Sequence, residues 1–145
     1  MSTDPKPVRC THCGAPAQLH LSSAAFYAGR DFGPVWVCEP CSALVGCHKG
    51  TTNALGKPAN KATRDLRKQA HAVFDPLWEA KVRLSGCSRT AARRAAYTWL
   101  AGQLGIHPGT CHISWMGSEE LERVIAVCTA VREAAQARRA QADAR

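Results

Sequence analysis

The chain has 145 residues, 46% of them hydrophobic, which is enough apolar material for a packed core and excludes a disordered tail. No apolar run approaches the roughly 20 residues of a membrane-spanning helix, and the first ten residues have no signal-peptide character. We therefore expect a soluble, cytoplasmic protein.

The net charge of +8 is concentrated in one part of the chain. Residues 48–94 contain eleven Lys or Arg and three Asp or Glu, whereas the segments before and after them are each neutral. A local excess of this kind indicates a surface that binds a partner, most often a polyanion.

Two Cys-x-x-Cys pairs, Cys10 with Cys13 and Cys38 with Cys41, dominate the start of the chain. Four thiolates at this spacing predict one tetrahedral zinc site. Because the protein fills all four positions around the metal, we expect this zinc to be structural and not catalytic. The 24 residues between the pairs contain two short β-type segments separated by turn residues. Residues 1–48 are therefore predicted to form a zinc ribbon built on a β-hairpin.

The other four cysteines do not have metal-ligand spacing. In a reducing compartment we expect them to be buried free thiols, because a free cysteine packs as a small apolar side chain. They are Cys47, Cys87, Cys111 and Cys128.

Residues 49–132 have the pattern of a helical domain whose first helix carries basic residues. Pro76 is expected to end that first helix, because proline lacks a main-chain donor. The Ala- and Arg-rich residues 133–145 should follow as a helical or frayed tail. The fold class is therefore α+β, a zinc ribbon followed by about four helices. The expected elements are a basic loop over 49–58 and helices over 59–74, 76–84, 89–103 and from Ser118 onward.

Apolar residues at helical spacing define the expected helical core. The predicted buried stripe of the first helix consists of Ala62, Leu66, Ala70 and Val73. The predicted contact between later helices joins Trp99 and Leu100 to Leu121, Val124 and Ile125.

The opposite face of the first helix is basic, and arginines early in a later helix extend this character. Such a row of cations can follow a phosphate backbone, so nucleic acid, either DNA or RNA, is the expected partner. A solvated helix face and an acidic protein partner are the alternatives. The candidate residues are Lys57, Lys61, Arg64, Arg67, Lys68, His71, Arg89, Arg93 and Arg94.

A further group has the side chains needed for a second metal site or a hydrolytic centre. These residues are His71, Asp75, His107, Cys111 and His112, with Cys47, His48 and Cys87. Their spacing does not unite them in one motif, so core histidines and a helix-capping aspartate are the default interpretation. The chain contains no Walker loop, dinucleotide-binding glycine motif, nucleophile elbow or His-Glu-x-x-His, and we assign no catalytic residue.

Several short motifs beyond the cysteine pairs follow one pattern. They are Val45-Gly46-x-His48, Leu55-Gly56, Arg64-x-x-Arg67-x-x-x-His71-x-x-x-Asp75-x-Leu77-Trp78, Ala96-Tyr97-x-Trp99-Leu100 and Cys111-His112-Ile113. From about Cys10 to Cys128 the chain resembles the zinc-finger-containing domain family of phage and prophage genomes, whose function is not established. Ser114-Trp115-Met116 departs from the family pattern, in which a glycine is expected. The resemblance implies a cytoplasmic setting in a bacterial or phage-infected cell, and it implies no activity.

Three functions from different classes follow from these features. The first is a small nucleic-acid-binding zinc-ribbon protein with a regulatory or accessory role. The alternative is a protein-interaction module or inhibitor that docks on a host complex such as RNA polymerase or defence machinery. The second alternative, a small metal-dependent nuclease, would need the histidines and Asp75 to act together.

Overall fold

The computed structural model describes residues 6–144, which form two compact units. The first unit contains residues 6–65 and Ser114–Gly117, and the second contains Leu66–Ile113 and residues 118–144. The chain therefore leaves the second unit to contribute four residues to the first, and then returns for its last helix.

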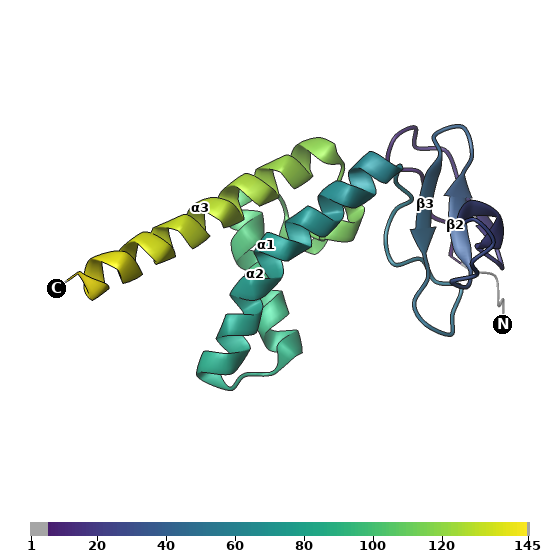
Figure 1. The fold of residues 1–145 in the computed structure, drawn as a ribbon. Coiled ribbons are helices and arrows are strands. Elements are labelled where there is room, and N and C mark those ends of the chain that lie inside the picture. The colour runs from purple at the N-terminus through teal and green to yellow at the C-terminus, as the bar shows by residue number, and fades with distance from the viewer. Residues whose placement is uncertain (1–5, 145) are drawn as a thin grey trace. The chain divides into compact units, whose positions relative to one another are not determined.

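A three-stranded antiparallel sheet forms the frame of the first unit (Figure 1). Its strands are β1 (Gln18–His20), β2 (Val35–Cys38) and β3 (Ala43–Gly46), and β2 lies in the centre. All four residues of β2 are buried. Because alternate side chains point to opposite faces, Val35 packs with Val37 and Leu44, whereas Cys38 packs with Cys10 and Ala43 on the other face. A 3₁₀ helix, η1 (Ala24–Phe26), lies between β1 and β2.

The free edge of β3 is covered by residues 54–59. Leu44 and Ala59 exchange two main-chain hydrogen bonds, of 2.9 and 3.0 Å, and the Leu55 N–H donates to the Gly46 carbonyl at 2.9 Å. These bonds satisfy donors and acceptors that an open sheet edge would leave exposed. The sequence analysis assigned the basic loop 49–58 to the helical domain, but the compact units place it with the ribbon.

Helix α1 (Lys61–Ser85) is one continuous helix of 25 residues, with Pro76 inside it. The expected break at this proline is therefore wrong, and the described residues contain three α-helices where about four were predicted. Proline removes one helical hydrogen bond and crowds the carbonyl four residues earlier. The helix carries that cost because Phe74 and Trp78, on either side of Pro76, are both buried.

The buried stripe of α1 is rotated from the predicted one. Its buried residues are Thr63, Arg67, Ala70, Phe74 and Trp78, spaced four, three, four and four residues apart. Ala62 is exposed, and Leu66 and Val73 are only half-buried. The prediction relied on the spacing of aliphatic residues. In the structure, the two large aromatic side chains determine which face of the helix is buried.

The other helices match their predicted bounds closely. Helix α2 (Arg89–Leu104) begins after Ser88, whose hydroxyl accepts from the Ala91 N–H at 3.1 Å, and ends at Gly105 in the left-handed conformation. Helix α3 (Ser118–Asp143) carries two glutamates in its first turn and includes most of the predicted tail. Short 3₁₀ helices η2 (Pro108–Thr110) and η3 (Ile113–Trp115) lie between them.

The core of the second unit is made of side chains with no more than 1% exposure. The larger ones are Phe74, Leu100, Cys111, Ile113, Leu121, Val124 and Cys128, and three alanines, Ala70, Ala92 and Ala101, are equally buried. Helices α2 and α3 contact each other as predicted, but Trp99 is only half-buried. Within residues 6–144, no helix has the length and apolar character needed to span a membrane.

Candidate metal centre

The first cysteine pair lies in a tight turn before β1. The His12 N–H points at the Cys10 sulfur at 3.3 Å, and the Gly14 N–H donates to the Cys10 carbonyl at 3.0 Å. Gly14 has a φ of 72°, which a residue without Cβ adopts at little cost. The turn therefore directs both sulfurs toward one side of the chain.

The second pair occupies the turn between β2 and β3. Cys38 is the last residue of β2, and Cys41 lies two residues before β3 begins. Ser42, directly after this pair, has a φ of 51° and donates its N–H to the Glu39 carbonyl at 3.0 Å. Each pair is thus followed by a residue in the left-handed region, one a glycine and the other a serine.

The four sulfur atoms lie within 4.8 Å of one another, and those of Cys13 and Cys38 are 3.6 Å apart. Zinc–sulfur bonds of about 2.3 Å in a tetrahedron place sulfurs about 3.8 Å apart, so the cluster has the size that zinc requires. Cys10 and Cys38 are buried and Cys41 is half-buried, while Cys13 is exposed. The four sulfurs belong to the two turns that the sequence analysis selected.

Electrostatics also favour a cation at the centre of the cluster. The main chain at Ala15, with smaller contributions from Cys38 and Cys41, lowers the pKa of Cys13 to about 7. The neighbouring Cys13, with burial, raises the pKa of Cys41 to about 12. Without a metal, one thiolate therefore suppresses ionisation of the next. A zinc ion at the centre would hold all four as thiolates and contribute folding free energy.

His12 lies outside this ligand set. Its Nε2 accepts from the Asn60 N–H at 3.0 Å, which ties the first turn to the segment before α1. The Thr11 N–H donates to the Pro58 carbonyl at 3.0 Å and adds a second link of the same kind. The metal therefore fixes two turns, and the hydrogen bonds of the first of them hold residues 58–60 in place.

A closed four-cysteine site on a small antiparallel sheet defines a zinc-finger protein with one structural zinc. The family model of a zinc-finger-containing domain matches residues 6–131, and the chain belongs to this family. No curated protein and no solved structure matches the chain.

The predicted basic face of α1 does not form one surface. Arg67 is 8% exposed and belongs to the buried stripe, so its place on an exposed face is wrong. Lys61 pairs with Asp65 at 2.9 Å, and Arg64 donates through Nη1 to the Ala59 carbonyl at 2.7 Å. Lys68 is exposed. The predicted buried stripe of α1 is rotated from the observed one. The predicted basic face was defined as the side opposite that stripe, so it is misplaced by the same rotation.

The arginines predicted on α2 lie on the surface of that helix. Arg89, Arg93 and Arg94 are all exposed near the start of the helix. The guanidinium carbons of Arg89 and Arg93 lie 5.2 and 5.7 Å from the centre of the Trp78 ring, within the range of cation–π contact. Arg93 and Arg94 also line a groove of about 460 Å³ with Tyr97 and His112.

The residues considered for a second metal site serve other purposes. His71 Nδ1 lies 3.2 Å from the Asp75 carboxylate, which also accepts from Trp78 Nε1 at 3.0 Å. His107 accepts from the Gly109 N–H and caps η2. His112 packs against Tyr97, with ring centres 5.2 Å apart. Over residues 6–144, the four-cysteine cluster is the only group of three or more potential ligands close enough to hold a metal.

The other cysteines are free thiols, as predicted. Cys111 and Cys128 are buried, and burial raises the pKa of both thiols, that of Cys128 to about 11. Cys47 and Cys87 are half-buried, which makes them less enclosed than expected.

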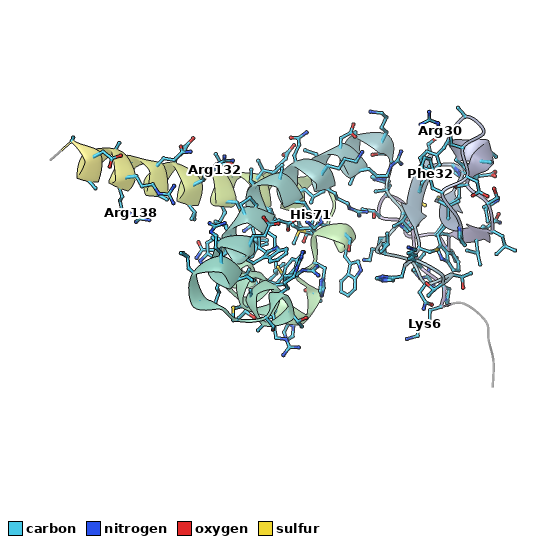
Figure 2. All side chains as sticks on the ribbon, turned by 60° about the horizontal axis from the view of Figure 1, so that its bottom comes forward. Lys6, Arg30, Phe32, His71, Arg132 and Arg138 are labelled. Atoms are coloured by element: carbon cyan, nitrogen blue, oxygen red, sulfur yellow. The ribbon has the colours of Figure 1, made fainter. Side chains whose placement is uncertain are left out.

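Sequence reasoning missed a groove in the first unit. Its lining includes Lys6, Arg9 and Trp115, none of which was a candidate, together with Lys57 and with His48, which was considered only for a second metal site. These residues come from three distant parts of the chain, so no local motif could identify them. Figure 2 labels Lys6 at one end of this unit and Arg30 with Phe32 at the other.

Proposed function

We propose that the protein binds nucleic acid through the groove beside α2, in a regulatory or accessory role. The observation that carries this proposal is the lining of the groove. Two arginines, two aromatic rings and two threonine hydroxyls converge there, and no acidic side chain of the part of the chain that the structure describes lines it. The residues that do so are Thr90, Arg93, Arg94, Tyr97, Thr98 and His112.

The N-terminal part of α2 adds to the positive electrostatic potential around these arginines. The first turn of α2 contains no acidic residue, so the partial positive charge of the helix N-terminus is not offset there. Stacking on Trp78 reduces the freedom of Arg89 and Arg93 before any partner binds, which lowers the entropic cost of binding. Arginine forks and helix N-termini are common partners of phosphate oxygens.

A salt series measures the proposed contacts directly. Fluorescence anisotropy with a labelled DNA duplex gives the dependence of the binding constant on salt, about −0.9 per phosphate contact on a log–log scale. We expect Arg93→Ala with Arg94→Ala to flatten that slope by about 1.8 and to weaken binding.

The matched control is Arg138→Ala with Arg139→Ala, which removes the same charge from an exposed part of α3. Figure 2 shows Arg138 on the C-terminal part of that helix. We expect this variant to keep the slope of the parent. If the two double variants lost affinity for the duplex equally, or if the parent showed no salt-sensitive binding, the groove beside α2 would not be a specific binding site.

A protein-interaction module is the second candidate, and an apolar surface of the second unit favours it. Leu84, near the end of α1, is 83% exposed. A groove of about 340 Å³ is lined mainly by apolar side chains, among them Leu77, Trp99 and Val131. This function would be supported by a partner protein that stays bound after nuclease treatment and that no longer binds the double variant Leu84→Ser with Trp99→Ala.

A further inference from the structure

The groove of the first unit has a basic lining that includes one indole. Its volume is about 720 Å³, and its walls carry Lys6, Arg9, Lys57, His48 and Trp115. Among the described residues, 6–144, no aspartate or glutamate lines the groove. Three permanent cations and one indole around an open cavity favour a ligand that is both anionic and aromatic.

Main-chain contacts bring the walls of this groove together. The Lys57 N–H donates to the Ser114 carbonyl at 3.0 Å, which places the loop before α1 beside the Trp115 turn. Gly56 permits this approach, because a Cβ at that position would lie 2.2 Å from the Ser114 carbonyl oxygen. Opposite them, the Arg9 guanidinium donates to the Gly14 carbonyl at 2.9 Å, within the first metal-binding turn. The groove therefore belongs to the frame that zinc holds.

Trp115 has the exposure that stacking requires. Its side chain is 42% exposed, although the residues on both sides of it are buried or half-buried. A tryptophan held in a structured turn beside lysine and arginine can stack on a base while the cations contact the flanking phosphates. A base inside a duplex has no free face, so this arrangement selects an unpaired strand.

We infer that this groove binds a short single-stranded segment of nucleic acid, with one base on Trp115 and the adjoining phosphates near Lys6, Arg9 and Lys57. The inference rests on the proposed function for the class of partner, which is nucleic acid. It deepens that function by stating that this groove binds the single-stranded form. It uses residues of the first unit only, so the two sites can be tested apart.

The test uses the zinc-bound full chain and an eight-nucleotide oligothymidylate, with a duplex of the same length for comparison. We expect Trp115→Ala to weaken binding of the single strand by about 5- to 150-fold, the range measured for loss of one stacked base. Trp115→Phe should recover part of that loss. Lys6→Ala with Lys57→Ala should flatten the single-strand salt slope by about 1.4, at about 0.7 per phosphate.

Phe32→Ala is the matched control, because Phe32 is a 70% exposed aromatic residue of the same unit, away from Lys6 (Figure 2). It should bind the single strand as the parent does. Zinc content and the indole spectrum of each variant report whether the first unit is folded. If Trp115→Ala fails to fold, the comparison of Trp115→Phe and Phe32→Ala decides the question.

The two proposals fail in different ways. Arg93→Ala with Arg94→Ala should weaken duplex binding and still show quenching of Trp115 by the oligothymidylate. Equal affinities of Trp115→Ala, Phe32→Ala and the parent for the single strand would overturn this inference and leave the α2 groove untouched. Binding of poly-glutamate as tight as that of the oligothymidylate, with the same dependence on Trp115, would also overturn it and would identify an acidic protein surface as the ligand.

Discussion

The two units bury very different amounts of large apolar side chain. In the first, the sheet contributes two small clusters, one around Val35 and Val37 and the other around two cysteines and Ala43. In the second, aromatic and aliphatic side chains such as Phe74 and Leu100 are fully buried between helices. Trp36 and Met116 are buried in the first unit as well, but a unit of roughly 60 residues is marginal in the apolar surface that it can bury. The comparison leads us to expect that the metal supplements a small core in the first unit, whereas the helical core alone holds the second.

Removal of zinc is expected to have the largest effect and to separate the units most clearly. Structural zinc contributes about 10–16 kcal/mol in small finger domains near pH 7. We expect chelation, or Cys38→Ser, to unfold the first unit while most helical signal remains. Trp36 and Trp115 report on the first unit and Trp78 and Trp99 on the second, so indole N–H resonances resolve the two events.

Elemental analysis should find one zinc per chain, and metal binding near pH 7 should release protons. The reason is that a thiol whose pKa is about 12, as at Cys41, is protonated before the metal arrives. Affinity for zinc should therefore fall as the pH is lowered. Retention of the Trp36 and Trp115 resonances in excess chelator would show that the first unit has a sufficient core of its own.

Truncation in the helical core should give the next largest effect. Leu100→Ala should destabilise the second unit by about 2–5 kcal/mol, because Leu100 is fully buried. Trp99→Ala should cost less than Leu100→Ala, although the tryptophan is larger, because Trp99 lines an open groove and is half-buried. Urea denaturation of the zinc-bound protein followed by helical circular dichroism measures both. The reverse order would place Trp99 in the core, as the sequence first indicated.

Gly56→Ala should have a smaller effect that is confined to the first unit. The added Cβ meets main-chain atoms of Ser114, which cannot rotate away, so we expect a loss of about 1–3 kcal/mol and shifted Trp115 resonances. Gly102→Ala is the matched control, since Gly102 lies within α2 with open space around it. That change should stabilise the helix by up to about 1 kcal/mol. A neutral Gly56→Ala would show that the loop moves freely against Ser114.

The smallest expected effect concerns the residues that follow the two cysteine pairs. Ser42→Gly should stabilise the zinc-bound first unit by about 0.5–1 kcal/mol, because it relieves a left-handed conformation at a residue with a Cβ. Gly14→Ser should have the opposite sign. Thermal unfolding monitored at the Trp36 resonance would resolve both shifts. Shifts of the same sign would mean that the side chains, and not φ, control these turns.

The sequence by itself determined the metal site, the bounds of α2 to within a residue and the start of α3. Four thiolates at fixed spacing are a local chemical requirement, and apolar residues at helical spacing are a local signal for the helices. Each of these signals acts within a few residues, so no knowledge of distant contacts was needed to identify it.

Only the tertiary structure decided which faces are buried and which distant residues meet. Burial of Phe74 and Trp78 keeps α1 continuous through Pro76. The same orientation of the helix buries Arg67, so the exposed arginines among the predicted basic residues are those of α2. Pairing at the edge of β3 and the close approach at Gly56 brought Lys57 beside Trp115. Hydrophobic burial has no direction of its own, so periodicity alone cannot settle the face of a helix that has apolar residues on two sides.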